Sequence, residues 1–339
     1  MSKKPKSSDS SPFVEAAEVP ERALRIYARL WQLETWLRRM VYVELRALKG
    51  DAWRKSLPKE SRSLQADKHL KHMPTPEMNA LSYAPLSKLA QLIEAHWSCF
   101  EAYFPPLELW QAKLKEISQI RHRIAHFRVG HADDYSRVLQ FLRDIDRGLW
   151  TFCTSYNDAR PILPQSDDVV TAHFLHLDPL PWREFETKKW ARVGSTDKSA
   201  VIGMTVEVLT RPWATLANQI DGTAGHFYDI RLMAHDRRKF DYGKFLDRSR
   251  HLHNHVAHLC LSSFEETFRL TVPAVLGSAK VIELIDAFLE IARYNVRRSA
   301  SAIEGQADSI AAEWPEYVLG PSDPLTFLDP EMKCASFGA

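Results

Sequence analysis

The sequence lacks the short motifs that mark several large enzyme classes. It contains no P-loop, no dinucleotide-binding glycine pattern, no HExxH zinc motif and no GxSxG nucleophile elbow. These absences argue against an ATPase, a dehydrogenase, a zinc protease or a serine hydrolase. No apolar run approaches the roughly 20 residues of a membrane-spanning helix. The polar start, with Ser and Lys but no apolar stretch, does not have the pattern of a signal peptide.

Cysteine is scarce, and neither sign of charge is in large excess. The four cysteines are scattered and form no CxxC pair, which is typical of reduced thiols in a cytosolic protein. We therefore expect a cytoplasmic protein, and nothing in the sequence calls for a cofactor or a membrane. The net charge of +2 excludes a globally basic nucleic-acid binder, but it is compatible with a local basic groove.

Apolar residues, in contrast, are plentiful. They make up 45% of the 339 residues and include ten Trp and sixteen Phe, which is enough for packed cores and, at this length, for two domains. Five of the tryptophans fall on predicted helices, where we expect core packing, because base stacking would need exposed rings. These five are Trp31, Trp36, Trp97, Trp110 and Trp150.

The first half of the chain has the pattern of a helical bundle. Residues 1–15 are polar and are expected to form a disordered lead, and the pattern of residues 16–158 predicts four apolar-periodic helices with short connectors. The first helix starts near Pro20, carries a wide apolar face that includes Leu24, Tyr27 and Trp31, and is closed by Gly50. The stretch 51–79 predicts a loop with short helical pieces. The second helix is expected over 85–104, the third ends with residues 121–126, and the fourth follows Asp133-Asp134.

The second half has a different texture and predicts an α+β domain over residues 165–303. A linker is expected at 160–164, before segments rich in β-branched and aromatic residues at 169–177, 199–210 and 226–234, which predict strands. Residues 259–261 and 267–272 suit a hairpin, and a helix is expected near 281–291. Residues 304–339 are expected to form a C-terminal tail. This half resembles no family that we identify.

The stretch with the clearest chemistry is Arg121-His122-Arg123-Ile124-Ala125-His126, at the end of the third helix. An arginine fork binds a phosphate and neutralises its charge, and a histidine exchanges a proton near neutral pH. Attack by a ribose 2′-OH on its own phosphate needs both of these functions and no metal. Arg121 and His126 are therefore candidates for RNA cleavage.

The pattern Arg-polar-x-x-x-His between two amphipathic helices resembles the signature of HEPN ribonuclease domains. The resemblance covers about residues 18–158, and His122 fills the slot where that family usually has Asn, Asp or His. It implies a metal-independent endoribonuclease that leaves a 2′,3′-cyclic phosphate. His126 would be the general acid or base, Arg121 would stabilise the phosphate charge, and His122 would orient His126 or share the proton transfer. It also implies a homodimer and a role as a toxin or antiphage effector, with an antitoxin or defence-system partner.

Other interpretations of this segment stay open. A related HEPN branch has a tyrosine two residues after the motif histidine, but this chain has Arg128 there. Arg123 and Arg128 either follow a phosphate backbone or are solvated helix charges. The whole segment could equally be a surface helix end with ordinary salt bridges. The alternative function is a non-catalytic HEPN module that scaffolds an assembly or binds nucleotide or RNA.

Geometry adds a condition to the catalytic interpretation. Five residues along a straight helix turn about 140° beyond a full circle, so Arg121 and His126 do not share a face. His122 and His126, four residues apart, do share one. Pairing of two copies of the motif across a dimer, which the resemblance implies, would ease this demand.

A second notable run is rich in histidine and includes Arg250, His251, His253, His255 and His258. On a helix, His251, His255 and His258 would share a face and could bind zinc with one more ligand, whereas on a strand His251, His253 and His255 would align. The run also echoes the Arg121–His126 pattern, which would suit a degenerate second motif. A substrate-facing role and an incidental cluster are further possibilities. We expect no metal, a position facing a cleft, and substrate contacts from Arg250, His251 and His255.

Overall fold

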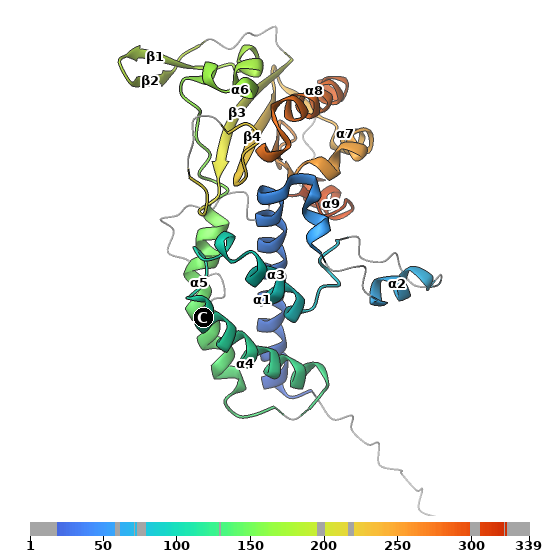
Figure 1. The fold of residues 1–339 in the computed structure, drawn as a ribbon. Helices are drawn as coiled ribbons and strands as arrows, with labels where there is room; N and C mark the ends of the chain where they lie inside the picture. Colours follow the sequence, from blue (N-terminus) through green and yellow to red (C-terminus); the bar gives the residue numbers. More distant parts are fainter. Residues whose placement is uncertain are drawn as a thin grey trace, which may run out of the picture.

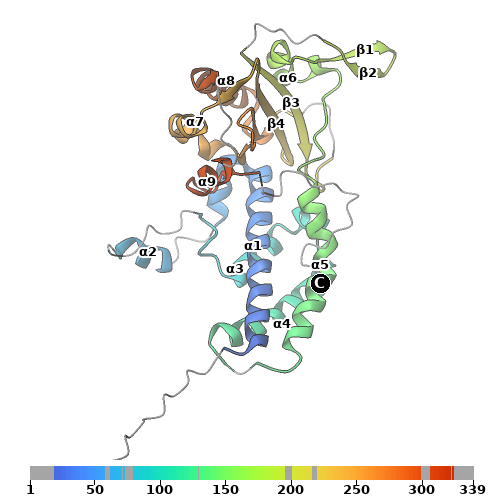
Figure 2. The ribbon, with the colours of Figure 1, turned by 180° about the vertical axis from the view of Figure 1, so that it is seen from behind.

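The computed structural model describes residues 19–57, 62–70, 72, 79–128, 130–194, 201–215, 220–298, 306–321 and 323. A helical region and a region built around a sheet are stacked end to end (Figures 1 and 2). Helix α1 (Glu21–Lys49) runs along the middle of the helical region and reaches the sheet region with its C-terminal end. Among the described residues, no helix combines the length and the apolar character needed to cross a membrane.

Three further helices pack with α1 around one apolar core, as the periodicity predicted. They are α3 (Leu86–Ala95), α4 (Leu107–Ala125) and α5 (Asp134–Thr154). Between α1 and α3 lie the 3-10 helix Gly50–Ser56 and helix α2 (Arg62–His69), in the stretch expected to hold short helical pieces. Helix α3 is shorter than predicted. The chain turns after Ala95, and this turn lets Phe104 stack on Trp110 with 4.2 Å between ring centroids.

A five-stranded sheet forms the centre of the second region, in the order β3-β4-β7-β6-β9. The strands are β3 (Ile202–Thr210), β4 (His226–Ala234), β6 (His258–Leu261), β7 (Thr267–Pro273) and β9 (Val318–Leu319). All neighbours are antiparallel except β6 and β9. The predicted strands at β3 and β4 and the predicted hairpin of β6 with β7 are therefore confirmed.

Helices and two small sheets surround this central sheet. The helices are α6 (Val169–Phe174), α7 (Tyr242–Ser249), α8 (Ser278–Tyr294) and α9 (Gln306–Ala312). Helix α6 packs on β3 and α8, and α7 packs on α8 (Figure 1). The small sheets pair β1 (Trp182–Glu186) with β2 (Lys189–Arg192) and β5 (Arg238–Phe240) with β8 (Val296–Arg298). An all-helical region is thus followed by an α+β region, as expected.

The strand prediction for residues 169–177 was wrong. This stretch forms α6 and a following 3-10 turn, Leu175–Leu177. The Asp168 carboxylate accepts a hydrogen bond from the Thr171 backbone N–H at 2.8 Å, which caps the start of the helix. Val170 and Phe174, four residues apart, are both buried, so the helical spacing decides the structure over β propensity.

Part of the expected C-terminal tail has regular structure. Helix α9 and strand β9 fall within residues 304–339, and β9 extends the central sheet by pairing Val318 with Leu259. Ala307, Tyr317 and Val318 are buried. Two such short elements give little periodic signal in sequence, because their burial depends on the sheet edge that they cover. Residues 324–339 lie outside the described residues, as do residues 1–18, which include the expected lead.

The two regions are joined by a buried polar junction at the C-terminal half of α1. The Glu44 carboxylate pairs with Arg211, which follows β3, at 2.6 Å, and neither side chain is exposed to solvent. The Trp213 indole N–H donates to the same carboxylate at 2.7 Å. Arg46 donates to the backbone carbonyls of Asn254 and Val256 at 3.0 and 2.6 Å. These bonds fix the sheet region on the end of α1.

Candidate functional site

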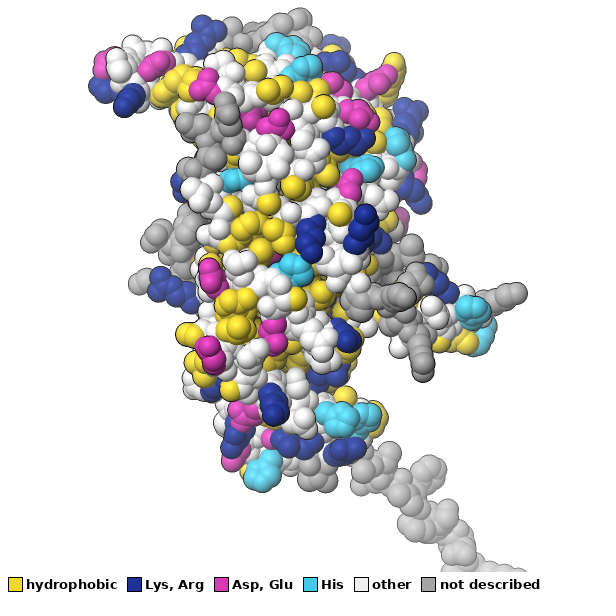
Figure 3. All heavy atoms as spheres, in the orientation of Figure 1, with side chains coloured by type: hydrophobic (Ala, Val, Ile, Leu, Met, Phe, Trp, Pro, Cys, Tyr) yellow, Lys and Arg dark blue, Asp and Glu magenta, His cyan; other side chains and the backbone are white. Residues whose placement is uncertain are grey.

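The Arg121–His126 motif lies at the exposed C-terminal end of α4. Ala125 is the last residue of the helix, and His126 caps it. Buried Trp110, Leu114 and Ile120 anchor the preceding turns in the bundle core. Histidine side chains lie beside Lys and Arg side chains at the end of the helical region remote from the sheet (Figure 3). The fold therefore places a titratable and positively charged group of side chains on the surface.

His122 and His126 form a pair on this helix end, as their spacing predicted. Their ring centroids are 4.4 Å apart, with an interplanar angle of 65°, and both residues are exposed. Desolvation and the positive charges of His126, Arg128 and Arg121 lower the pKa of His122. Close to neutral pH this ring is thus mostly neutral and able to accept a proton.

Arg121 is directed towards α1 and pairs there with Glu34. Its Nε donates to Glu34 Oε1, and Glu34 Oε2 also accepts a hydrogen bond from Arg38 Nη2 at 2.8 Å. Arg38 is itself fixed by a 3.1 Å hydrogen bond from Nε to the Leu81 carbonyl. One carboxylate thus lies between two guanidinium groups, which leaves a local excess of positive charge.

Within one chain, the side chains of Arg121 and His126 do not interact directly. Among the described residues, no hydrogen bond joins Arg121 to either motif histidine, and the two terminal guanidinium nitrogens of Arg121 make no hydrogen bond. The two positions lie about 140° apart around an ideal helix. The terminal nitrogens of Arg121 keep their capacity to bind an anion.

A hollow of about 250 Å³ opens beside Arg121. Its wall is formed by side chains of the N-terminal half of α1 and the last turns of α4, namely Tyr27, Leu30, Trp31, Glu34, Arg38, Arg121, Ile124 and Ala125. A larger hollow, of about 400 Å³, shares Trp31 and Arg38 with it and extends along α1 to Tyr42 and His258. Sequence reasoning found Arg121 but missed Glu34 and Arg38, because their contacts with it depend on how α1 and α4 pack.

Trp31 departs from the sequence prediction. We expected core packing, but 60% of this residue is exposed, and Tyr27, one turn earlier, is 59% exposed. Of the other tryptophans on helices, Trp110 is fully buried, and Trp36, Trp97 and Trp150 are half-buried. The buried stripe of α1 runs through Ile26, Leu30 and Leu33, and Tyr27 and Trp31 lie beside this stripe on the helix, where their rings reach solvent.

The two other arginines of the motif region have different surroundings. Arg123 Nε donates to the buried Asp134 carboxylate at 3.2 Å, and that carboxylate also accepts from the His131 backbone N–H at 2.8 Å. This ion pair ties the end of α4 to the start of α5, which is a structural role. Arg128 is exposed and follows Phe127, which is 96% exposed and has a positive φ of 54°.

The histidine-rich run is neither a regular helix nor one strand. Residues Arg250–His255 form a 3-10 helix that leads into β6. His253 and His258 are buried, and His251 is exposed, so the expectation that the run faces a cleft holds only in part. His255 Nδ1 lies 2.6 Å from Asp51 Oδ2. The described residues contain no group of three or more His, Cys, Asp or Glu side chains arranged to bind a metal.

This run is also remote from the motif and has a different context. Arg250 pairs with Asp247 at 3.2 Å and lies over the Trp314 ring. Glu34, which contacts the motif, and Arg46, which contacts the histidine-rich run, are twelve residues apart on α1. Along a helix, twelve residues span about 18 Å. The run follows an eight-residue helix and enters a strand, so the fold does not support a degenerate second motif there.

Burial of two histidines predicts sensitivity of the fold to acid. Desolvation is the main cause that lowers the pKa of His253 to about 4 and that of His258 to about 3. Both groups bind protons in the unfolded chain near pH 6.5 but resist protonation in the fold. Stability is therefore full above about pH 6.5 and falls as the pH drops towards 4, by on the order of 3 kcal/mol per histidine.

Urea unfolding between pH 7 and 4.5 measures this effect. The variant His258→Gln removes one titrating group and should lose less stability over this range than the wild type. Equal slopes for the wild type and His258→Gln would contradict the assignment.

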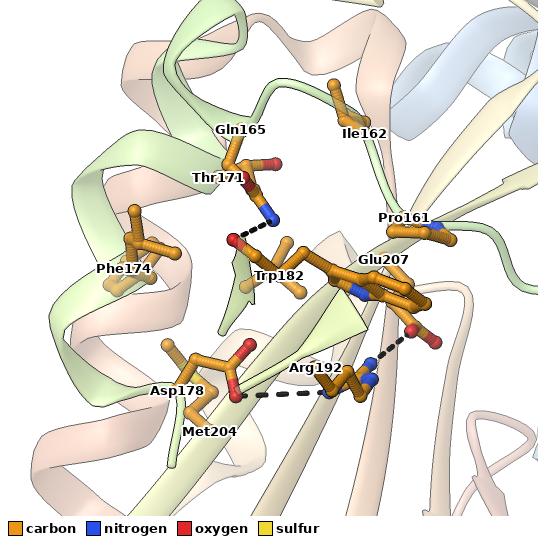
Figure 4. Close-up of a pocket in the computed structure, with 12 residues that line it drawn as sticks. Pro161, Ile162, Gln165, Thr171, Phe174, Asp178, Trp182, Arg192, Met204 and Glu207 are labelled. Carbon is orange, nitrogen blue, oxygen red and sulfur yellow. Dashed lines mark hydrogen bonds and ion pairs between the residues drawn. The ribbon is translucent and has the colours of Figure 1, made fainter. Parts of the chain in front are cut away.

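A further small hollow lies between α6, β2 and β3 (Figure 4). Its volume is about 10 Å³, which is roughly the space needed for a single water molecule. Arg192 spans it, pairs with Glu207 at 2.6 Å and stacks against the Trp182 ring. These contacts hold the β1–β2 hairpin on β3, and the space is too small for a ligand.

The three cysteines in the described residues, Cys99, Cys153 and Cys260, are free and buried.

Comparisons with protein-family models, curated proteins and solved structures found no match. Function is therefore inferred from the residues at the C-terminal end of α4, from their geometry and from the motif resemblance.

Proposed function

We propose that this protein is a metal-independent endoribonuclease that works as a homodimer. The observation that carries the proposal is the exposed His122–His126 pair, with ring centroids 4.4 Å apart, next to Arg121 on the same helix end. The excess of positive charge there suits a polyanion. The Arg-polar-x-x-x-His pattern, which resembles that of HEPN ribonucleases, agrees with it.

The proposed reaction is transesterification within the RNA strand. One histidine removes the 2′-OH proton, the 2′ oxygen bonds to the adjacent phosphorus, and the bond from phosphorus to the 5′ oxygen breaks. A histidine returns a proton to that leaving oxygen, so a 2′,3′-cyclic phosphate and a 5′-OH are formed. Arg121 and Arg128 neutralise charge on the phosphate. We assign proton transfer to His126, with His122 as the second proton carrier or as the group that orients it.

The angular separation of the motif residues on α4 supports the homodimer in this proposal. Since Arg121 and His126 lie about 140° apart around the helix, we assign to a complete site one group from each of two copies placed across a two-fold axis. A nuclease of this kind suits a toxin or antiphage effector in the cytoplasm that is held in check by an antitoxin or another defence-system partner. That setting is part of the proposal through the family resemblance alone.

The test of the activity is cleavage of RNA in EDTA. Purified protein should cut single-stranded RNA without a divalent metal and leave 2′,3′-cyclic phosphate ends, detected by mass spectrometry of the products. DNA of the same sequence should stay intact because it lacks the attacking 2′-OH. Cleavage of DNA, or activity that disappears in EDTA, would contradict the mechanism.

The pairing of Arg121 with Glu34 favours one alternative. An arginine already neutralised by a carboxylate suits a module that binds RNA or nucleotide, or scaffolds an assembly, without cutting. Such a module would bind RNA in the EDTA assay and leave it intact. Glu34→Gln distinguishes the two, since a freer Arg121 should strengthen RNA binding in both cases but change cleavage only in the nuclease.

A further inference from the structure

Two large aromatic side chains stand exposed on one face of α1, one turn apart. Tyr27 and Trp31 are 59% and 60% exposed, and their spacing of four residues places them side by side on the helix. Leu24, one turn earlier, is 54% exposed. Rings of this size are normally buried or serve a contact, so an exposed neighbouring pair indicates a binding surface.

The same two rings line the hollow of about 250 Å³ that contains Arg121. Leu30 is buried and closes the floor, and Arg38 and Arg121 flank the space on either side of Glu34. The volume is a little below the about 300–1,000 Å³ of pockets for drug-sized ligands. A single planar ring system with an attached phosphate suits this combination of size, aromatic wall and positive charge.

We propose that Tyr27 and Trp31 form a base-stacking subsite for single-stranded RNA, which holds a nucleobase next to the phosphate that Arg121 binds. This inference rests on the proposed function and assigns to it a substrate class, unpaired RNA. Bases stack on exposed aromatic rings without sequence preference, whereas the bases of a duplex are hidden from such rings. The subsite therefore selects loops and single strands.

Charge favours RNA over a second copy of the chain as the occupant of this face. The hollow is bordered by two guanidinium groups and one carboxylate, and Arg128 and the two motif histidines lie on the adjoining helix end. Two such faces in direct contact would bring like charges together, whereas in the proposed dimer a phosphodiester chain lying between the two helix ends neutralises these charges. The adjoining larger hollow shares Trp31 and Arg38, so the strand has a route onward along α1.

Binding of an uncleavable strand tests the subsite separately from catalysis. A fluorescent 2′-O-methyl oligouridylate has no attacking 2′-OH, so its anisotropy titration reports affinity alone. We expect Trp31→Ala to raise Kd about tenfold, Tyr27→Ala to have a smaller effect in the same direction, and Trp31→Phe to restore most of the affinity. Tyr294→Ala, which removes a ring that is even more exposed, at the end of α8, should leave Kd unchanged.

Each remaining outcome is decisive. Equal Kd values for wild type and Trp31→Ala overturn the subsite, and RNA cleavage measured in parallel shows whether the proposed nuclease function stands without it. A wild-type protein that does not bind the oligonucleotide also overturns the subsite. Light scattering is run on the same samples. If Trp31→Ala converts a dimer into a monomer, this face is a contact between copies and the RNA proposal fails.

Discussion

Replacement of Glu44 by alanine is expected to lower the free energy of unfolding by about 3–5 kcal/mol, the usual cost of removing one partner of a buried ion pair. Glu44 and Arg211 have no exposed side-chain surface, and the carboxylate also accepts hydrogen bonds from Tyr103 and Trp213. Without Glu44, a charged guanidinium stays buried with no anion beside it. Chemical denaturation with urea measures the change.

Two further variants separate the ion pair from the packing around it. Arg211→Met should destabilise by a similar amount, because it leaves the Glu44 carboxylate buried without its cation. The double variant Glu44→Met/Arg211→Met should be much more stable than either single variant, since neither unpaired charge remains. An exposed pair, Arg160 with Asp158, serves as the control, and Asp158→Ala should change stability by less than about 1 kcal/mol. A neutral Glu44→Ala would contradict the account of the junction.

Much of the fold was predictable because long elements repeat the same signal many times. Helices α1, α4 and α5 each carry many apolar residues at helical spacing. Strand β3 is rich in β-branched residues and β4 contains aromatic residues and Ile230, so local pattern and final burial agree. The stretch Val169–Phe174 was misassigned because its β-branched residues indicate a strand, while the decisive signals are the Asp168 cap and the burial of Val170 and Phe174.

Part of the candidate site follows from residue spacing within one helix, and part depends on contacts between residues that are distant in the sequence. The His122–His126 pair follows from a spacing of four residues on one helix, so the sequence predicts it. The contact between Arg121 and Glu34 joins residues 87 positions apart, and no local pattern encodes it. Arg123 likewise appeared to be a substrate contact, but its pairing with Asp134 depends on the turn between α4 and α5. Trp31 appeared to be a core residue because α1 is apolar over a wide face, and the sequence does not show that only the stripe through Ile26 and Leu30 is covered by the other helices.

Replacement of His126 by alanine is expected to reduce RNA cleavage by about 10²–10⁴-fold, the usual contribution of a general acid or base. The residue is exposed at the end of α4, so its removal should leave the thermal unfolding temperature nearly unchanged. His131→Ala is a matched control, because His131 is equally exposed in the following loop, and it should retain full activity. Cleavage rates and unfolding curves are measured on the same preparations. Wild-type cleavage by His126→Ala would remove this residue from the mechanism.

Mixing two inactive chains tests whether the site is shared between copies. If the Arg121 of one chain and the His126 of its partner act on the same phosphate, then Arg121→Ala and His126→Ala homodimers are both inactive. A mixed dimer, in contrast, keeps one complete site with both wild-type residues, and statistical exchange of subunits should restore about one quarter of the wild-type activity, because half of the dimers are mixed and each has one of two sites. Light scattering at micromolar concentration should report a dimer for the wild type and both variants. A strict monomer that still cleaves RNA would show that each chain holds a complete site, and a dimer without restored activity would place Arg121 and His126 of the same chain in one site.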